Sequence, residues 1–429
     1  MTIANYMDSS CFKIRNGIEF YYFGEGLIAD YHGSSIAYLD SIDCKIISLL
    51  NESNSLIKTK ACLLNEKVIE SEEINYRIQN LRKKGVVVYG ENQNKKLIFY
   101  GEKGLYYPKN LVIELTDICN YKCPFCYKNA KSKGCYISDS IVEKIYSLTK
   151  GNVKNVLFTG GEPTLHPHYL NYINMFSEYA RVTMISNGSK IFEHDPKILR
   201  KLDHIQFTIY GCNDNEYKVM TGVKDGFTRL CKSVKYVKEN NINTIAAVTL
   251  CDTTMHKIEG YIQTAITLGF KSIRIGMADV FGRGKYLIES LYKDKERTQS
   301  AYDELLMIKH NYRNRIMIEL PNIDYSHVNN HKDLIENVYR NSLTCGCGSE
   351  VLVVSQQGKI RPCQMLPDDR FSIEEEDALK QHICGNFHTE ELHQATQRYY
   401  DENNFYDMNI VPCNALDSLM KGIKRSNVL

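Results

Sequence analysis

Three cysteines lie within eight residues in the segment Cys119-Asn120-Tyr121-Lys122-Cys123-Pro124-Phe125-Cys126, called here the cysteine loop. A structural zinc site is closed by four ligands, whereas this loop offers three, and no fourth cysteine follows at zinc-finger distance. Closely spaced thiolates also hold iron–sulfur clusters, and a missing fourth ligand leaves one iron open to a small molecule. Because Asn, Lys and Pro make a poor apolar core, three merely buried thiols are disfavoured. The spacing therefore predicts an open iron–sulfur site.

Short apolar runs alternate with helical stretches from residue 111 to about residue 309. Strands are expected at 111–115, 153–158, 181–186, 204–209, 244–250 and 271–275. Helices are expected at 138–149, 168–179, 226–239 and 257–268. This alternation predicts βα units around a parallel sheet. A site in such a fold would lie at the carboxyl ends of the strands.

Polar motifs follow the strands at those ends. The turn Gly160–Pro163 comes directly after one strand, Ser186 and Asn187 end the next, and Thr208 lies in the one after that. Two glycines allow a backbone to approach a ligand closely, and Glu162 can accept hydrogen bonds from an ammonium group. Each motif alone is also ordinary turn chemistry. Their positions after strands favour a binding role.

The segment from Glu114 to Tyr127 resembles the cluster loop of the radical S-adenosylmethionine (radical SAM) enzymes, with the signature spacing of three cysteines and an aromatic residue before the last. The resemblance implies a partial (β/α)6 barrel, a [4Fe–4S] cluster on Cys119, Cys123 and Cys126, and SAM at the open iron. It places the contacts to SAM on Phe125, Gly160, Gly161, Glu162, Pro163, Ser186, Asn187 and Thr208.

The strand that often carries an acid in relatives has Tyr210 in its place. This departure argues against an acid/base role there, and no other residue stands out as a catalytic acid or base. Arg274 lies in the last expected strand, and Arg283 follows it closely. We expect them to be solvated or paired with carboxylates rather than catalytic.

A second group of cysteines lies near the C-terminus. Ten residues separate Cys347 from Gly358, and four separate Gly358 from Cys363. This spacing resembles the start of the SPASM and twitch extensions, which bind auxiliary iron–sulfur clusters. Too few cysteines follow for a second auxiliary cluster, so the shorter twitch form, with one auxiliary [4Fe–4S] cluster, fits better. Its implied ligands are Cys345, Cys347, Cys363 and Cys413, with Cys384 as the competitor. If Cys345 or Cys413 is not a ligand, one iron would be open to a substrate thiolate.

The first ninety residues form a smaller pattern. Short aromatic strands are expected between Glu19 and Asp40, helices at 41–50, 56–64 and 71–84, a strand at 86–89 and a linker at 90–107. This order is typical of a winged-helix-like module. Residues 1–90 contain ten Lys and Arg and eleven Asp and Glu. Because basic residues are not in excess, binding of duplex nucleic acid is disfavoured. In this position the module resembles an element that binds a leader peptide at a sheet edge. A purely structural cap is the alternative.

The whole chain has 429 residues, a formal net charge of +2 and fifteen cysteines. Its length suits two or three domains, expected at 1–92 (peptide recognition), 108–310 (barrel) and 340–429 (iron–sulfur extension). So many cysteines without a secretory leader favour a reducing cytoplasm and metal over disulfides. No apolar run approaches the roughly 20 residues that span a bilayer. We therefore expect a cytoplasmic protein whose partners include neither nucleic acid nor membrane.

The order of the three parts resembles the sactipeptide and ranthipeptide maturases. The resemblance implies that a deoxyadenosyl radical abstracts hydrogen from a precursor peptide and that a substrate cysteine sulfur closes on that carbon as a thioether. It implies as partners a precursor peptide with a leader and a flavodoxin- or ferredoxin-like one-electron donor. Three alternatives stay open: carbon–carbon crosslinking or epimerisation of a peptide, a small-molecule dehydrogenase, and a non-enzymatic peptide- or DNA-binding regulator.

Overall fold

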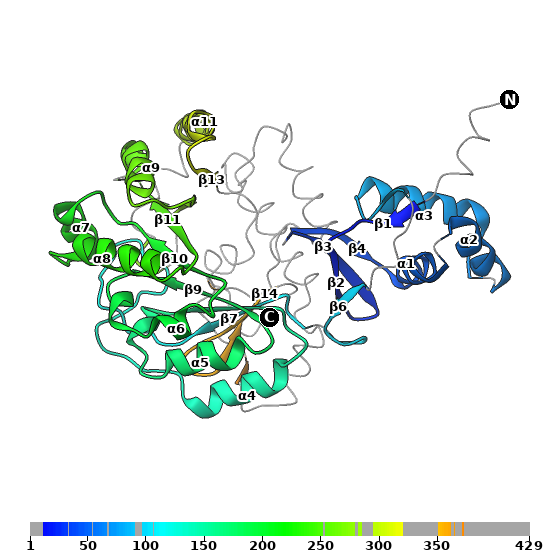
Figure 1. Cartoon of the computed structure of the whole chain (residues 1–429), viewed down its shortest axis with the longest axis horizontal. Coiled ribbons are helices and arrows are strands. Elements are labelled where there is room, and N and C mark those ends of the chain that lie inside the picture. Colours follow the sequence, from blue (N-terminus) through cyan, green and yellow to red (C-terminus); the bar gives the residue numbers. More distant parts are fainter. Residues whose placement is uncertain are drawn as a thin grey trace, which may run out of the picture. The chain divides into compact units, whose positions relative to one another are not determined.

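The structure is a computed structural model that describes most of the chain. The described residues are 12–32, 34–53, 55–66, 68–90, 97–105, 107–251, 254–278, 282–284, 295–320, 351–361, 364 and 371–372. They divide into two compact units, one that ends at Lys109 and one that begins at Asn110 (Figure 1). The expected auxiliary-cluster ligands Cys345, Cys347, Cys363 and Cys413, and their competitor Cys384, lie outside the described residues.

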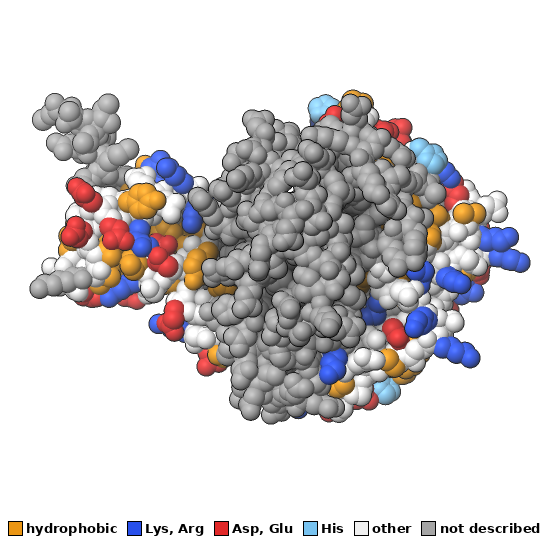
Figure 2. Space-filling model, turned by 180° about the vertical axis from the view of Figure 1, so that it is seen from behind, with side chains coloured by type: hydrophobic (Ala, Val, Ile, Leu, Met, Phe, Trp, Pro, Cys, Tyr) orange, Lys and Arg blue, Asp and Glu red, His pale blue; other side chains and the backbone are white. Residues whose placement is uncertain are grey.

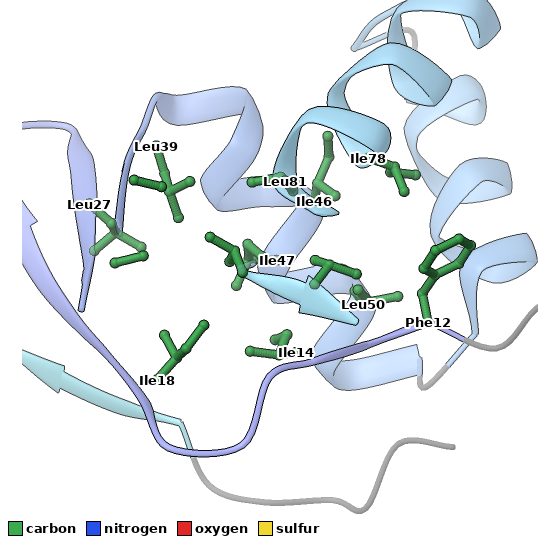
Figure 3. Close-up of a cluster of buried hydrophobic side chains, with 14 of the residues drawn as sticks. Phe12, Ile14, Ile18, Leu27, Leu39, Ile46, Ile47, Leu50, Ile78 and Leu81 are labelled. Carbon is green, nitrogen blue, oxygen red and sulfur yellow. The ribbon is translucent and has the colours of Figure 1, made fainter. Parts of the chain in front are cut away.

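The N-terminal unit contains the expected strands and three helices. They are β1 (Phe12–Ile14), β2 (Ile18–Phe23), β3 (Gly26–Tyr31), β4 (Ser34–Leu39), α1 (Ser41–Ser53), α2 (Leu56–Asn65), α3 (Ser71–Lys83), β5 (Val87–Tyr89) and β6 (Ile98–Tyr100). Strand β1 pairs with β5 in one antiparallel ribbon, and a second sheet has the order β4-β3-β2-β6. These strands and helices together surround one apolar core (Figure 3).

Periodic apolar residues explain why the helices form and which faces they bury. In α1 the side chains of Ile46, Ile47 and Leu50 are at most 1% exposed, at the spacing of one helical face. Asp40 caps the start of α1 by accepting from the backbone N–H groups of residues 42 and 43 at 2.9 and 2.8 Å. Arg77 of α3 donates to the same carboxylate, which joins the first and third helices.

The expectation of a plain linker at 90–107 is wrong in part, because β6 lies within it. This strand pairs in parallel with β2, which places Phe99 opposite Phe20 and Tyr100 opposite Tyr21. Both aromatic pairs stack, with ring centroids 5.3 and 5.0 Å apart. Such cross-strand aromatic pairs stabilise a strand that is too short for its own sequence to predict.

The second unit is built on a ten-stranded sheet of order β13-β12-β11-β10-β9-β8-β7-β14-β15-β16. The six expected strands are its centre, in chain order: β7 (Asn110–Glu114), β8 (Asn155–Thr159), β9 (Arg181–Ser186), β10 (His204–Thr208), β11 (Thr244–Leu250) and β12 (Ser272–Met277). All neighbouring pairs among these six strands are parallel. The prediction of an α/β fold on a parallel sheet is confirmed.

Two further parallel strands extend this sheet beyond the expected six. Strand β13 (Met317–Glu319) joins β12, and β14 (Val351–Val354) joins β7 at the opposite edge. An antiparallel continuation follows β14 through β15 (Lys359–Arg361) to β16 (Phe371–Ser372). The sheet therefore reaches into the part of the chain expected to form a separate extension. Edge pairing between distant segments depends on tertiary packing that local sequence does not encode.

Helices connect the parallel strands and flank the sheet (Figure 1). They are α4 (Asp139–Thr149), α5 (Tyr169–Phe176), α6 (Pro196–Leu199), α7 (Asp214–Thr221), α8 (Gly226–Glu239), α9 (Ile258–Thr267) and α11 (Lys295–Tyr312). Because the strands are parallel, their carboxyl ends share one edge, where the loops after β7, β8, β9 and β10 gather. Within the described part of the chain, no helix is long and apolar enough to cross a bilayer.

Candidate cluster and cofactor site

The cysteine loop leaves the carboxyl end of β7 and is closed by backbone hydrogen bonds. The Cys119 N–H donates to the carbonyl of Lys131 at 2.7 Å, and the Lys131 N–H donates to the carbonyl of Asp117 at 3.1 Å. Inside the loop, the Cys126 N–H donates to the carbonyl of Cys123 at 3.3 Å. This closure brings the ends of the segment together, so the three thiols are presented on one short turn.

Backbone amides also donate to the sulfur atoms of the loop. The N–H of Tyr121 lies 3.3 Å from the Cys119 sulfur, and the N–H of Ala130 lies 3.4 Å from the Cys126 sulfur. Such N–H···S contacts stabilise thiolate charge and are one of the levers that set iron–sulfur potentials. The loop is thus arranged for ionised sulfur ligands.

The thiols themselves resist ionisation without a cation. Burial, with the nearby charges of Glu162 and Cys126, raises the pKa of Cys119 to about 12. Burial also raises the pKa of Cys123, and the neighbouring thiolates of Cys119 and Cys126 add to that rise. A coordinated metal deprotonates such a thiol outright. The three thiols therefore fit a bound group that contains metal cations.

The Gly160–Pro163 turn packs on the backbone that leads into the cysteine loop. The Gly161 N–H donates to the carbonyl of Thr116 at 2.7 Å, and the Glu162 N–H donates to that of Ile118 at 2.8 Å. A Cβ on Gly161 would lie 2.2 Å from the Ile118 oxygen, and one on Gly160 would lie 2.4 Å from the Thr116 oxygen. The two glycines therefore allow close approach to the chain itself, whereas the sequence had suggested approach to a ligand.

Glu162 braces the ends of two neighbouring strands. Its carboxylate is 1% exposed and accepts from Thr164 Oγ1 at 2.6 Å, Ser186 Oγ at 2.8 Å and the Asn187 N–H at 2.7 Å. The N–H of Thr164 donates as a fourth partner at 3.1 Å. Burial raises the pKa of Glu162, and these hydrogen bonds oppose that rise. The expected contact of this carboxylate with the amino group of SAM stays a prediction.

Asn187 connects the turn after β9 to the cysteine loop. Its side-chain amide donates to Asn120 Oδ1 at 2.9 Å and lies 3.9 Å from the Cys119 sulfur. Asn120 in turn donates to Ser189 Oγ at 2.8 Å. The structure thus brings the predicted residues Ser186 and Asn187 to the cysteines. The sequence analysis did not predict that Asn120 belongs to the site, although its position next to Cys119 could have indicated this.

Three aromatic rings pack against one another next to the cysteines. The Phe125 ring stacks on Tyr210 with centroids 6.0 Å apart and an interplanar angle of 15°, and Tyr121 meets Tyr210 edge-on at 5.6 Å. Hydrogen bonding from the Tyr210 side chain opposes the rise in the pKa of Cys123. Thr208 ends β10 two residues earlier. Tyr210 therefore contacts Cys123, whose role as a cluster ligand stays a prediction.

The expectation for Arg283 is wrong, whereas that for Arg274 is confirmed. Arg274 pairs with Glu319 at 3.0 Å, with its side chain 47% exposed. Arg283 instead donates from Nε to the Cys123 carbonyl at 2.8 Å and from Nη1 to the Ala130 carbonyl at 2.8 Å. The acceptors are backbone carbonyls that the folded cysteine turn presents to this guanidinium, and the local sequence does not reveal them.

A buried ion cluster lies beside the cysteine loop. Glu114, the last residue of β7, is fully buried and pairs with Lys128 and Arg361. Lys128 also donates to Gln356 Oε1 at 2.9 Å. Burial lowers the pKa of Lys128, and the charge of Glu114 opposes that shift. Sequence analysis missed this cluster because its members come from three distant segments.

Comparison with known proteins identifies the segment that carries these motifs. Residues 113–265 match the Radical SAM superfamily. The chain contains a radical SAM domain. Members of this superfamily bind SAM and a [4Fe–4S] cluster, and the three cysteines of the loop lie inside the matched segment. The resemblance stated from the sequence is therefore confirmed at the level of the domain.

Curated relatives of the radical SAM domain are distant but extend beyond it. The chain is 22% identical over 334 residues to the subtilosin biosynthesis protein AlbA of Bacillus subtilis, covering 75% of this chain and 69% of AlbA. It is 25% identical over 272 residues to the sporulation killing factor maturation protein SkfB of the same organism, covering 62% of each chain. It is 21% identical over 262 residues to the PqqA peptide cyclase of Methylorubrum populi, covering 60% of this chain and 66% of the cyclase. The alignments to SkfB and the cyclase span less than two thirds of those proteins.

A solved structure shares the fold over most of the chain. Streptococcus suis SuiB, crystallised with its precursor peptide SuiA, superposes with a TM-score of 0.58 at 16% identity and covers 86% of this chain and 87% of its own. This similarity establishes the α/β radical SAM fold. The assignment of individual residues to SAM contacts remains a prediction.

Replacing Gly161 by alanine tests whether the turn must contact the loop backbone. We expect a loss of about 1–3 kcal/mol in the free energy of unfolding, because the added methyl overpacks the Ile118 carbonyl. Gly276→Ala in β12 is the control, since its Cβ would meet nothing closer than the Val248 oxygen at 3.9 Å. Urea denaturation of both variants measures the difference. Equal stability of the two variants would contradict the assigned role of Gly161.

Proposed function

We propose that this chain is a radical SAM enzyme that modifies a ribosomally synthesised precursor peptide by installing thioether bridges from cysteine sulfur to carbon. The observation that carries the proposal is the loop of three mutually interacting thiols, braced by the turns after β8 and β9 at the carboxyl edge of the sheet. The names of AlbA, SkfB and the PqqA peptide cyclase, and the SuiB complex with a precursor peptide, support a peptide substrate.

The chain's own residues would bind and orient the reactants. When bound, the [4Fe–4S] cluster supplies the electron that cleaves SAM and so starts hydrogen removal from the peptide. Glu162 and Asn187 keep the ends of β8 and β9 against the cysteine loop, while the ring pair Phe125 and Tyr210 excludes water from one side. No described side chain stands out as a dedicated acid or base, so we assign none; the proton that the substrate thiol loses would pass to solvent.

The N-terminal unit is proposed to bind the leader of the precursor as a strand added at the outer edge of β4. Among the described residues β4 pairs with β3 alone. Of the twelve large hydrophobic side chains that are exposed among the described residues, seven belong to this unit, and Figure 2 shows hydrophobic atoms on its surface. The seven are Tyr38, Ile57, Leu64, Tyr76, Tyr89, Ile98 and Phe99. An added strand would gain main-chain hydrogen bonds at the edge of β4.

The remaining partners belong to the same proposal. One auxiliary [4Fe–4S] cluster on Cys345, Cys347, Cys363 and Cys413 would accept the surplus electron or hold the substrate thiolate. A flavodoxin- or ferredoxin-like protein would supply the first electron. Anaerobic reconstitution followed by iron analysis is expected to give the iron of two clusters per chain. An iron content of one cluster would contradict the auxiliary site while leaving the first cluster in place.

The decisive experiment first searches the DNA beside this gene for a short open reading frame that encodes cysteines, and then uses the encoded peptide as substrate. After reaction with reconstituted enzyme and SAM, we expect a loss of two hydrogens per bridge, with the substrate thiols no longer reactive toward alkylating agents. The same mass loss with reactive thiols would favour a carbon–carbon crosslink. Unchanged mass with inverted residues in the hydrolysate would favour epimerisation. Failure to cleave SAM after reconstitution would favour a non-enzymatic peptide-binding protein.

A further inference from the structure

The segment Gly282-Arg283-Gly284 lies directly on the cysteine loop, although it follows Cys123 by more than 150 residues. The Arg283 N–H donates to the Cys126 carbonyl at 3.0 Å. Gly282 has φ +57°, and a Cβ there would lie 2.4 Å from the Cys126 oxygen and 2.2 Å from the Tyr127 oxygen. This contact is therefore built at a position where only glycine fits without strain.

The Arg283 side chain then fastens the loop at several points. Besides the contacts to the carbonyls of Cys123 and Ala130, Nη1 donates to Asn129 Oδ1 at 3.1 Å. These acceptors lie at the second cysteine and three to four residues after the third. A planar guanidinium with five N–H donors can hold them at once, whereas an ammonium cannot match this fork.

One nitrogen of this guanidinium has no acceptor from the described chain. Arg283 Nη2 is buried and makes no hydrogen bond with any residue that the structure describes. A buried, unpaired cationic donor costs more free energy than a neutral one, so an acceptor is expected from a bound group. The sulfide-rich, anionic cluster that the cysteine loop would hold is an acceptor of this kind.

We propose that Arg283 is a positioning residue for the cluster: it holds the cysteine loop in its ligand-ready shape and donates Nη2 to the bound cluster, which raises the cluster's reduction potential. A positive charge and a hydrogen bond both stabilise the more negative, reduced state. The inference rests on the cluster of the proposed function and is independent of the peptide chemistry.

The test compares Arg283→Met and Arg283→Lys with a control variant, Arg274→Met. In the wild type, Arg274 pairs with the exposed side chain of Glu319. Each protein is reconstituted anaerobically, without SAM. The midpoint potential is measured by redox titration with electron paramagnetic resonance, and iron loss is measured in the presence of a chelator. Neither readout depends on turnover.

For Arg283→Met we expect a more negative potential and iron loss about 10–100-fold faster than in the wild type. Arg283→Lys is expected to keep most of the potential, because its charge remains, yet to lose iron faster, because it cannot hold all the carbonyls. Arg274→Met should match the wild type in both. A wild-type potential in Arg283→Met would overturn the inference. A wild-type protein that assembles no [4Fe–4S] cluster would overturn the proposed function instead.

Discussion

Replacing Cys119, Cys123 or Cys126 by alanine is expected to abolish both cluster binding and SAM cleavage. Each thiol is one of only three in the loop, so the loss of any one leaves only two cysteine ligands for the cluster. Each variant should fold, because the loop is closed by backbone hydrogen bonds that do not involve the thiols. Iron content, visible absorbance and 5′-deoxyadenosine release after anaerobic reconstitution measure the effect.

The matched control for these variants is Cys231→Ala. Cys231 is a half-buried thiol on α8, outside the cysteine loop. This variant should retain the iron of the first cluster and wild-type cleavage of SAM. If any variant of the three loop cysteines still cleaved SAM at the wild-type rate, the assignment of the loop as the cluster site would be refuted, and the peptide chemistry proposed from it would have no source.

Replacing Glu114 by alanine is expected to cost about 3–5 kcal/mol of folding free energy, the largest effect predicted for a residue outside the cysteine loop. The side chains of Lys128 and Arg361 are each 8% exposed, and the substitution would remove the fully buried carboxylate that they share. Glu114→Gln should be milder, since it keeps the shape and one acceptor. Urea denaturation followed by circular dichroism measures both variants.

Glu193→Ala provides the comparison for the loss of an ion pair at the surface. Glu193 pairs with Lys190 at 3.4 Å, with the two side chains 41% and 38% exposed, respectively. Such an exposed pair contributes about 0–1 kcal/mol. If Glu114→Ala were no less stable than Glu193→Ala, the buried ion cluster would have no role in joining β7, the segment after the cysteine loop and β15.

Much of the site could be predicted from sequence because its signals are local. The spacing of Cys119, Cys123 and Cys126 is contained in eight residues, and the six central strands are short apolar runs bounded by turns. Parallel pairing then requires that Gly160–Pro163 and Asn187 meet the cysteine loop at one edge of the sheet. Neither step requires contacts between distant segments to be known in advance.

Other features depend on which distant segments meet. Strand β14 is a run of four residues whose place beside β7 is decided by packing at the sheet edge. Arg283 looked like a solvated arginine because its acceptors are carbonyls that only the folded cysteine turn presents. The sequence does not predict that Gly160 and Gly161 contact the carbonyls of Thr116 and Ile118, because these carbonyls are more than forty residues away in the chain.

By itself, the sequence determined the chemistry that this protein can support: three thiols at cluster spacing, followed by polar turns at the ends of parallel strands. The tertiary structure alone decided what holds that chemistry in place: the brace from Glu162, the fork of Arg283 and the buried charge of Glu114. Ligand type and spacing are written in consecutive residues. Hydrogen-bond partners and buried charges become defined only when the folded chain excludes water and leaves each polar group with the neighbours that remain.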